Sequence, residues 1–285
     1  MNYRHHFHAG NFADVMKHSL LVLLVRQLQR KESGFLILDT HAGRGGYDLE
    51  TASRGASLER KPEWPDGIGR LWGRPESNET LEDYLGLVRA FNRSAGGPSA
   101  PRYYPGSPGL AFRLARPQDR MAFCELHPED HSALSRSFGR EGRVSVHPTD
   151  GYSALRAMLP PNERRALVFI DPPFERPDEW SAIADALREG LGRFPSGVYA
   201  VWYPLTARSG AGGLFRRLGG LRLPPTIAAE LSINPGASGV EGCGLLVINP
   251  PWQFELKAGP MLDGLAQRLA VAPGAQSRLL WLERE

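Results

Sequence analysis

The stretch Ala166-Leu167-Val168-Phe169-Ile170-Asp171-Pro172-Pro173-Phe174 decides the fold class. Its first five residues are apolar and partly β-branched, which is typical of a strand buried in a parallel sheet. Asp171 stands where this strand ends, and α/β enzymes bind their ligands at the carboxyl ends of such strands. Two prolines then stiffen the turn and leave carbonyl oxygens as acceptors, with the aromatic Phe174 beside them. Taken alone, these residues favour a plain strand-ending turn capped by Asp171; in a ligand site, they suit a planar group that carries an amine.

Three further apolar runs upstream also lead to an acidic residue. The runs and their acids are 34–38 with Asp39, 120–124 with Glu125, and 144–147 with Asp150. Because the ends of parallel strands converge on one crevice at the switch point of a doubly wound sheet, we expect a nucleoside to lie across these four carboxylates. Ionised carboxylates only accept hydrogen bonds, so an acid after the second strand suits a ribose diol and one after the third suits an adenine amine.

This layout predicts an α/β, Rossmann-like sheet of an S-adenosylmethionine-dependent methyltransferase. The first run is followed by the glycine-rich turn Asp39-Thr40-His41-Ala42-Gly43-Arg44-Gly45-Gly46, which would let backbone approach a ligand closely. The turn is a weak signal by itself, because its spacing is not the G-x-G-x-x-G of a dinucleotide fold. A pyrophosphate carrier such as NAD fits less well, since the clustered anions would repel it.

The amino-terminal motif Tyr3-Arg4-His5-His6-Phe7-His8-Ala9-Gly10-Asn11-Phe12-Ala13-Asp14-Val15-Met16-Lys17-His18 is long and specific. It resembles the opening of the RlmJ family, bacterial adenine-N6 methyltransferases of 23S ribosomal RNA, and the similarity extends over essentially the whole chain. The other motifs that carry it are Leu38-Asp39-Thr40-His41-Ala42-Gly43, Arg102-Tyr103-Tyr104-Pro105-Gly106-Ser107-Pro108, Glu125-Leu126-His127-Pro128, Asp171-Pro172-Pro173 and Val247-Ile248-Asn249-Pro250-Pro251-Trp252.

The resemblance implies roles for individual residues. The residues that it implies for contact with S-adenosylmethionine are His18, His41, Ser107, Glu125, Asp150, Gly151 and Asp171. Asp171 would also be the catalytic acceptor, with the Pro172 carbonyl beside it, and Tyr3 would lie on the target-nucleotide side. Phe174 stands where the family pattern often has tyrosine; both rings stack on a base, but phenylalanine lacks the hydroxyl group.

Composition agrees with an intracellular RNA enzyme. The chain has 285 residues, 41% of them hydrophobic, which is enough for one sizeable α/β core. We find no apolar stretch of transmembrane length and no apolar secretory core near the start, so we expect a cytoplasmic protein, and we take a monomer as the working expectation. Lysine and arginine total 34, of which only four are lysines, while the net charge is +3. Arginine suits RNA through bidentate phosphate contacts and base stacking, although a GC-rich coding bias explains the same skew equally well.

The chain is predicted to form a single domain, residues 1–285, that contains a mainly helical inserted subdomain at 48–101. About 75 residues separate the glycine turn from the next clear strand, far more than one crossover needs. Within this interval 80–92 has helical spacing and 50–66 appears irregular at its start. The inserted part is a reasonable resting place for RNA, and a solvated ornament is the alternative. Elsewhere we expect helices at 11–31 and 180–191, a strand at 197–203, another helix, and a final strand at 244–249.

Two other sequence patterns resemble functional sites. Asn249-Pro250-Pro251-Trp252 resembles the catalytic turn of amine methyltransferases, but it follows a late strand, so we interpret it as a strand-ending turn that lines the substrate side at most. Four of the eight histidines fall in the first eighteen residues, yet no cysteine or carboxylate spacing typical of zinc accompanies them, so we expect no metal. Cys124 and Cys243 lie in apolar runs and are expected to be buried thiols.

Three other functions remain open at this point. A methyltransferase of DNA or of protein amines would use the same donor pocket and turn. A nicotinamide-linked oxidoreductase is disfavoured by the four carboxylates. A non-enzymatic RNA-binding protein on a methyltransferase fold is disfavoured by the intact Asp171-Pro172-Pro173-Phe174 turn.

Overall fold

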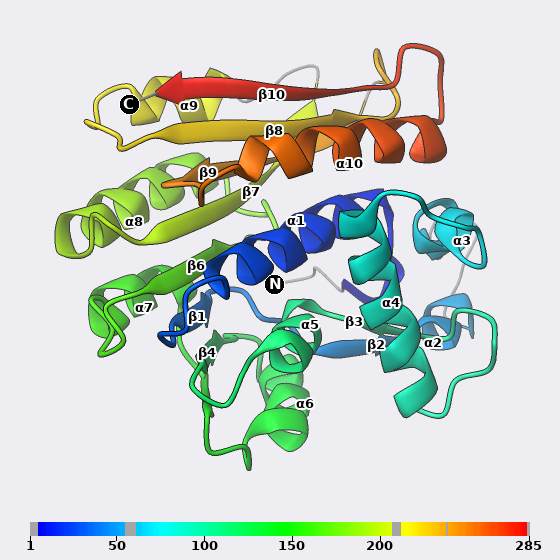
Figure 1. Cartoon of the computed structure of the whole chain (residues 1–285), viewed down its shortest axis with the longest axis horizontal. Coiled ribbons are helices and arrows are strands. Elements are labelled where there is room, and N and C mark those ends of the chain that lie inside the picture. The colour runs from blue at the N-terminus through cyan, green and yellow to red at the C-terminus, as the bar shows by residue number, and fades with distance from the viewer. Residues whose placement is uncertain (1–4, 55–60, 207–211, 238, 284–285) are drawn as a thin grey trace.

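A mostly parallel sheet, covered by helices on both faces, forms the centre of the computed structural model (Figure 1). The structure describes residues 5–54, 61–206, 212–237 and 239–283. The strands of the large sheet are, in chain order, β1 (Leu36–Asp39), β4 (Arg120–Cys124), β5 (Val144–His147), β6 (Ala166–Ile170), β7 (Val198–Thr206), β8 (Thr226–Ser232), β9 (Val240–Ile248) and β10 (Gln276–Glu283).

The sheet combines a parallel part with an antiparallel edge. Its strand order is β10-β8-β9-β7-β6-β1-β4-β5, and β7, β6, β1, β4 and β5 run parallel. β9 runs antiparallel to both β7 and β8, and β10 antiparallel to β8. The order reverses beside β1, where β4 and β6 flank it, and this is the switch point at which doubly wound sheets bind ligands. The α/β prediction and the runs at 120–124, 144–147 and 166–170 are confirmed.

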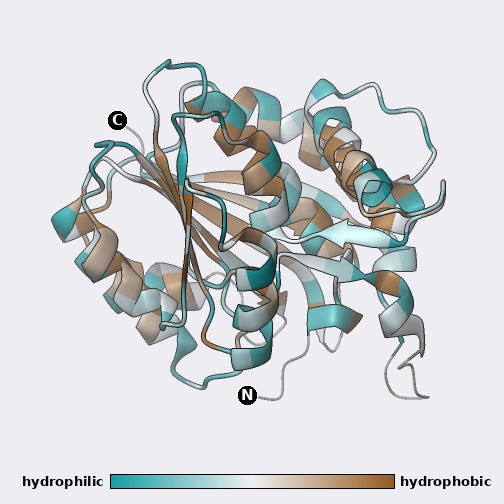
Figure 2. Cartoon of the chain, turned by 90° about the horizontal axis from the view of Figure 1, so that it is seen from below, coloured by the Kyte–Doolittle hydropathy of each residue, from teal (hydrophilic) through white to brown (hydrophobic). Residues whose placement is uncertain are grey.

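The helices divide between the two faces of the sheet. On one side of the sheet lie α1 (Phe12–Leu28), α5 (Ser107–Leu114), α6 (Pro128–Phe138) and α10 (Phe254–Leu269). Two further helices, α3 (Ile68–Leu71) and α4 (Glu79–Ser94), belong to the same core and pack on α10, and α4 also packs on α1. Against the other face pack α7 (Gly151–Met158), α8 (Glu179–Arg193) and α9 (Gly212–Leu218). Figure 2 shows apolar strands between helices whose outer surfaces are hydrophilic, which is the pattern expected when both faces of a sheet are buried.

α1 is nearly surrounded by protein, and its residues from Val15 to Val25 are buried. Asn11 caps its first turn by accepting a hydrogen bond from the amide of Asp14 at 2.9 Å. Because this helix is apolar and buried on most sides, the few charged groups within it must find partners inside the protein.

A two-stranded ribbon closes the insertion. β2 (Gly46–Asp48) pairs antiparallel with β3 (Tyr103–Pro105), so the chain leaves and re-enters the fold at neighbouring positions. Between them lie α2 (Leu49–Arg54), the 3₁₀ turn η2 (Trp64–Asp66), α3 and α4. The expectation of an irregular start at residue 50 is wrong, because α2 already begins at Leu49. The strands β8 and β10 were also not predicted.

Candidate active site

A cavity of about 730 Å³ opens at the carboxyl ends of β1, β4, β5 and β6. It is lined by eight of the residues named from the sequence, which are His18, His41, Ser107, Glu125, Asp150, Gly151, Asp171 and Pro172. Asp39 does not line the cavity and is buried, at 1% exposure. The expected convergence of the strand-end carboxylates therefore holds for Glu125, Asp150 and Asp171 and is wrong for Asp39. Tyr3 lies outside the described residues.

Glu125 organises the glycine turn after β1. Its carboxylate accepts hydrogen bonds from the amides of Gly43 at 2.8 Å and His127 at 2.7 Å. Burial raises the pKa of Glu125, and these two backbone hydrogen bonds oppose the rise. Gly43 has φ +60°, and a side chain there would meet the Tyr47 hydroxyl oxygen at 2.5 Å, so only glycine suits this turn.

Asp150 and Gly151 start α7 against the end of β1. Asp150 caps the helix by accepting from the amide and hydroxyl of Ser153, at 3.0 and 2.9 Å. A Cβ added to Gly151 would lie 2.0 Å from the carbonyl oxygen of Thr40. The absence of a side chain therefore lets α7 begin directly above β1, and this places Asp150 on the cavity wall.

Burial shifts the pKa values of two polar groups at the end of β1, Asp39 and His41, toward their uncharged forms. Burial raises the pKa of Asp39 to about 7, against a hydrogen bond with Ser107 that lowers it, while the charge of Asp171 adds to the rise. Burial lowers the pKa of His41 to about 4, although Asp171 and Asp150 oppose this. The amide of His41 donates to the Asp39 carboxyl at 3.3 Å, so the buried Asp39 holds the backbone of a residue that lines the cavity.

His18 is part of a buried hydrogen-bond chain. Its Nδ1 lies 2.8 Å from the Tyr104 hydroxyl, which lies 2.9 Å from the Tyr84 hydroxyl on α4. Burial lowers the pKa of His18 to about 3, so the ring is neutral. The histidine thus joins α1 to the ribbon and to the insertion, in addition to reaching the cavity wall.

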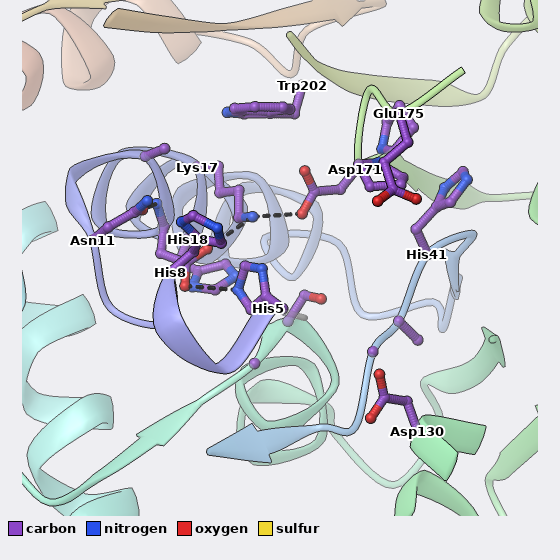
Figure 3. Close-up of a pocket in the computed structure, with 18 of the residues that line it drawn as sticks. His5, His8, Asn11, Lys17, His18, His41, Asp130, Asp171, Glu175 and Trp202 are labelled. Atoms are coloured by element: carbon purple, nitrogen blue, oxygen red, sulfur yellow. Dashed lines mark hydrogen bonds and ion pairs between the residues drawn. The ribbon is translucent and has the colours of Figure 1, made fainter. Parts of the chain in front are cut away.

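Lys17 forms an ion pair with the carboxylate of the strand-ending turn, and the sequence did not single it out. Its Nζ lies 2.6 Å from Oδ2 of Asp171 and 2.8 Å from Oδ1 of Asp14 (Figure 3). Asp14 also accepts from the Gly10 amide at 2.8 Å and contacts Nε2 of His5 at 3.1 Å. This buried network ties the amino-terminal segment to Asp171.

Asp14 carries a negative charge within this network. Burial acts to raise the pKa of Asp14, but the charges of Lys17 and His5 and the His5 hydrogen bond together hold it well below its usual value. One signal in the sequence could have revealed the pair. Asp14 and Lys17 are three residues apart in an otherwise apolar helix, so they share a face and must be buried together.

Trp202 on β7 is among the aromatic residues that line the cavity, and Phe174 is not. The Phe174 backbone is left-handed at φ 52°, and its ring packs at 4.7 Å from that of Trp180 and 5.7 Å from that of Trp202. Pro172 lines the cavity as expected.

The comparison with known proteins decides the family. Residues 32–283 match the protein family described as "Ribosomal RNA large subunit methyltransferase D, RlmJ". The chain belongs to the RlmJ family. It is 38% identical to the "Ribosomal RNA large subunit methyltransferase J" of Escherichia coli K12 and 37% identical to the protein of the same name from Haemophilus influenzae, each over the full length of both chains.

A solved structure agrees over the same extent. The crystal structure of protein LPL1258 from Legionella pneumophila superposes with a TM-score of 0.83 at 35% identity, covering 96% of this chain and 97% of that one. The sheet with its inserted helices is therefore the Rossmann-like methyltransferase fold of an RlmJ-family member.

The second Pro-Pro motif of this RlmJ-family chain lies far from the cavity. β9 runs antiparallel to β7, with Ile248 opposite Tyr199, so Asn249 emerges where β7 begins. Its side-chain amide donates to the carbonyls of Pro195 and Gly197, both at 2.8 Å. Asn249 therefore ends β9 beside the amino-terminal end of β7, whereas the cavity lies at the carboxyl ends of the parallel strands. The motif is a strand-ending turn, and the idea that it lines the substrate side is wrong.

Three remaining expectations concern metals, thiols and membrane helices. Within residues 5–54, 61–206, 212–237 and 239–283, no group of three or more histidine, cysteine or acidic side chains is arranged to hold a metal ion. Cys124 and Cys243 are buried free thiols, which confirms the prediction for them. In the same described part of the chain, no helix combines the length and apolarity that a membrane crossing requires.

Proposed function

We propose that this protein is an S-adenosylmethionine-dependent methyltransferase that methylates the N6 amine of one adenine in 23S ribosomal RNA. The observation that carries the proposal is the Asp171 carboxylate, held beside Pro172 and Pro173 on the wall of the cavity at the switch point of the sheet. The names of the relatives from Escherichia coli and Haemophilus influenzae support the ribosomal substrate. We expect the protein to act as a monomer in the cytoplasm, where ribosomal RNA is made.

The residues around the cavity fit the methyl donor. A volume of about 730 Å³ lies within the range of sites that bury small cofactors. Glu125 suits the ribose diol, Asp150 and Gly151 suit the adenine end, and the Gly43 turn allows close backbone approach. His18, His41 and Ser107 supply further polar contacts. When bound, S-adenosylmethionine supplies an electrophilic methyl group, so the protein itself needs no covalent nucleophile.

Asp171 orients the amine and then takes up a proton. The lone pair of the adenine amine is delocalised into the ring, and hydrogen bonds from its N–H groups to Asp171 and to the Pro172 carbonyl favour tetrahedral geometry at nitrogen. A carboxylate is too weak a base to deprotonate the neutral amine beforehand, so Asp171 accepts the proton during or after transfer. Orientation of this kind is worth about 7–11 kcal/mol in favourable intramolecular models.

Lys17 holds the Asp171 carboxylate in position. Its ammonium group contacts Asp171 at 2.6 Å and is itself held by Asp14, so the carboxylate is fixed before a base enters. Tyr3 is proposed to lie on the target-nucleotide side, as the resemblance to the RlmJ family implies. Residues 48–101 are proposed to form a mainly helical inserted subdomain of the single 1–285 domain, beside the RNA path.

Methyl transfer to 23S ribosomal RNA tests the proposal directly. The wild-type protein, supplied with labelled S-adenosylmethionine and RNA transcribed in vitro, is expected to form N6-methyladenosine at one position located by mass spectrometry. Asp171→Asn should abolish transfer while calorimetry shows donor affinity within about threefold. Asp185→Asn is the matched control, because Asp185 lies on the surface of α8 in an exposed pair with Arg188, outside the cavity lining, and should retain full activity.

Each alternative predicts a different outcome. Preferred transfer to matched DNA would assign the site to DNA, and donor binding without transfer to any RNA would leave an RNA-binding protein. Tight binding of NAD in place of the methyl donor would point to an oxidoreductase. Turnover by Asp171→Asn close to that of the parent would remove Asp171 from its role.

A further inference from the structure

Trp202 and Asp171 are neighbours on the same face of the sheet. β6 and β7 run parallel with Ile170 opposite Val201, so the next residue of each strand turns to the other face. That face is the one that α1 covers, and Trp202 packs partly against its core. An indole surface and an acceptor carboxylate therefore stand side by side on one wall of the cavity.

The ammonium group of Lys17 shows where an amine fits between them. Its Nζ lies 2.6 Å from Asp171 Oδ2 and 5.6 Å from the ring centroid of Trp202, and Figure 3 shows all three converging. Offset-stacked rings have centroids about 4.5–7 Å apart. An exocyclic amine on a base stacked against the indole would therefore lie about as far from the Asp171 carboxylate and from the Trp202 ring as Nζ of Lys17 does. A nitrogen donor of the protein thus stands near the position that the substrate amine must reach.

Phe174 is not free to provide this surface. Its ring faces Trp180 and Trp202 edge-on, with interplanar angles of 61° and 70°, and it lies outside the cavity lining. The T-shaped contact, with 5.7 Å between the ring centroids, instead packs Phe174 against the indole of Trp202. The aromatic residue of the turn therefore supports the indole, while the neighbouring strand presents it.

We propose that Trp202 is the stacking surface for the target adenine, with Phe174 as the residue that positions it. This inference rests on the proposed function and specifies how its substrate base is held. On entry, the base lays its ring against the indole and brings its amine to the Asp171 carboxylate, beside the Lys17 ammonium. The arrangement selects a planar base that carries an amine, because one ligand then satisfies both the carboxylate and the aromatic face.

The test separates stacking from folding and from donor binding. One aromatic platform contributes about 1–3 kcal/mol per base, so Trp202→Ala should raise the KM for 23S ribosomal RNA by about 5- to 150-fold. Donor affinity measured by calorimetry should stay within about twofold, and Trp202→Phe should recover most of the loss. Trp252→Ala is the matched control, because Trp252 is 78% exposed at the opposite edge of the sheet and should leave KM unchanged.

A fluorescent base gives a readout that a merely structural role would not move. With 2-aminopurine at the mapped target position, binding to the wild-type protein should quench its fluorescence, and binding at saturation to Trp202→Leu should not. The proposal is overturned if Trp202→Ala leaves the KM for RNA within twofold, or if quenching survives in Trp202→Leu. Failure of the wild-type protein to methylate RNA would instead overturn the proposed function, and this inference with it.

Discussion

Removal of the Lys17 charge should destabilise the whole protein, because Lys17 neutralises a carboxylate in the core. The Lys17 side chain is 6% exposed and that of Asp14 is 1% exposed. Breaking a buried ion pair from one side typically costs about 3–5 kcal/mol. We expect Lys17→Met to lower the free energy of unfolding by roughly that amount at pH 7, measured by urea denaturation. Arg26→Met is the control, since the Arg26–Asp83 pair is exposed and should be worth about 0–1 kcal/mol.

A second substitution and a change of pH identify the cause. Asp14→Asn in the Lys17→Met background should restore part of the loss, because it removes the unpaired charge. In the parent, the depressed pKa of Asp14 stabilises the fold fully above its ordinary value near 3.8, and this contribution is lost as pH falls through the folded value. Without Lys17, burial raises that pKa, so the gap between variant and parent should narrow from pH 7 toward pH 4. A loss below about 1 kcal/mol, or no recovery in the double variant, would refute the reasoning.

Three more predictions follow from buried contacts at the strand ends. Gly151→Ala should destabilise the protein by about 1–3 kcal/mol in thermal or urea unfolding, because the new Cβ meets the Thr40 carbonyl oxygen. Gly192→Ala is the control, because a Cβ at that position of α8 meets no atom within 4 Å and should not destabilise the protein. Equal stability of the two variants would contradict this prediction. The parent protein should lose stability as pH rises from 4 to 8, because Asp39 has a pKa of about 7 in the folded protein and ionises more readily when unfolded. Asp39→Asn lacks this titration, so its free energy of unfolding should rise relative to the parent's by on the order of 4 kcal/mol at most across that window. A difference that does not change with pH would exclude the raised pKa. Glu125→Gln should weaken S-adenosylmethionine binding about 10- to 100-fold by calorimetry, because charged hydrogen bonds contribute about 1.5–3 kcal/mol, and an unchanged Kd would place the donor elsewhere.

The central strands could be predicted because their signal is local. β4, β5 and β6 are short, largely apolar runs bounded by polar residues, and the structure reproduces their ends. β10 escaped prediction because it is an edge strand that alternates between exposed and partly buried residues, and β8 reads equally well as a helix. For both, the pairing with a neighbouring strand decides the conformation, and this pairing is not visible in a local window.

The cavity was predictable where residues follow strand ends, and not where they come from elsewhere. Glu125, Asp150 and Asp171 reach it because parallel strands end at one edge. Lys17 comes from a helix more than 150 residues earlier in the chain, and Trp202 looked like one apolar residue among several in its strand. Their meeting in the cavity depends on how α1 packs against this face of the sheet, which the spacing of residues does not encode.

The direction of β9 bears on how this chain should be searched for motifs. The Pro-Pro turns at Asp171 and Asn249 lie at opposite ends of the strands of one sheet, because β6, which precedes Asp171, runs antiparallel to β9, which precedes Asn249. A pattern search that ignores strand polarity would score Asn249-Pro250-Pro251-Trp252 as a second catalytic centre. Knowing which way the preceding strand points is enough to tell a reactive turn from its look-alike.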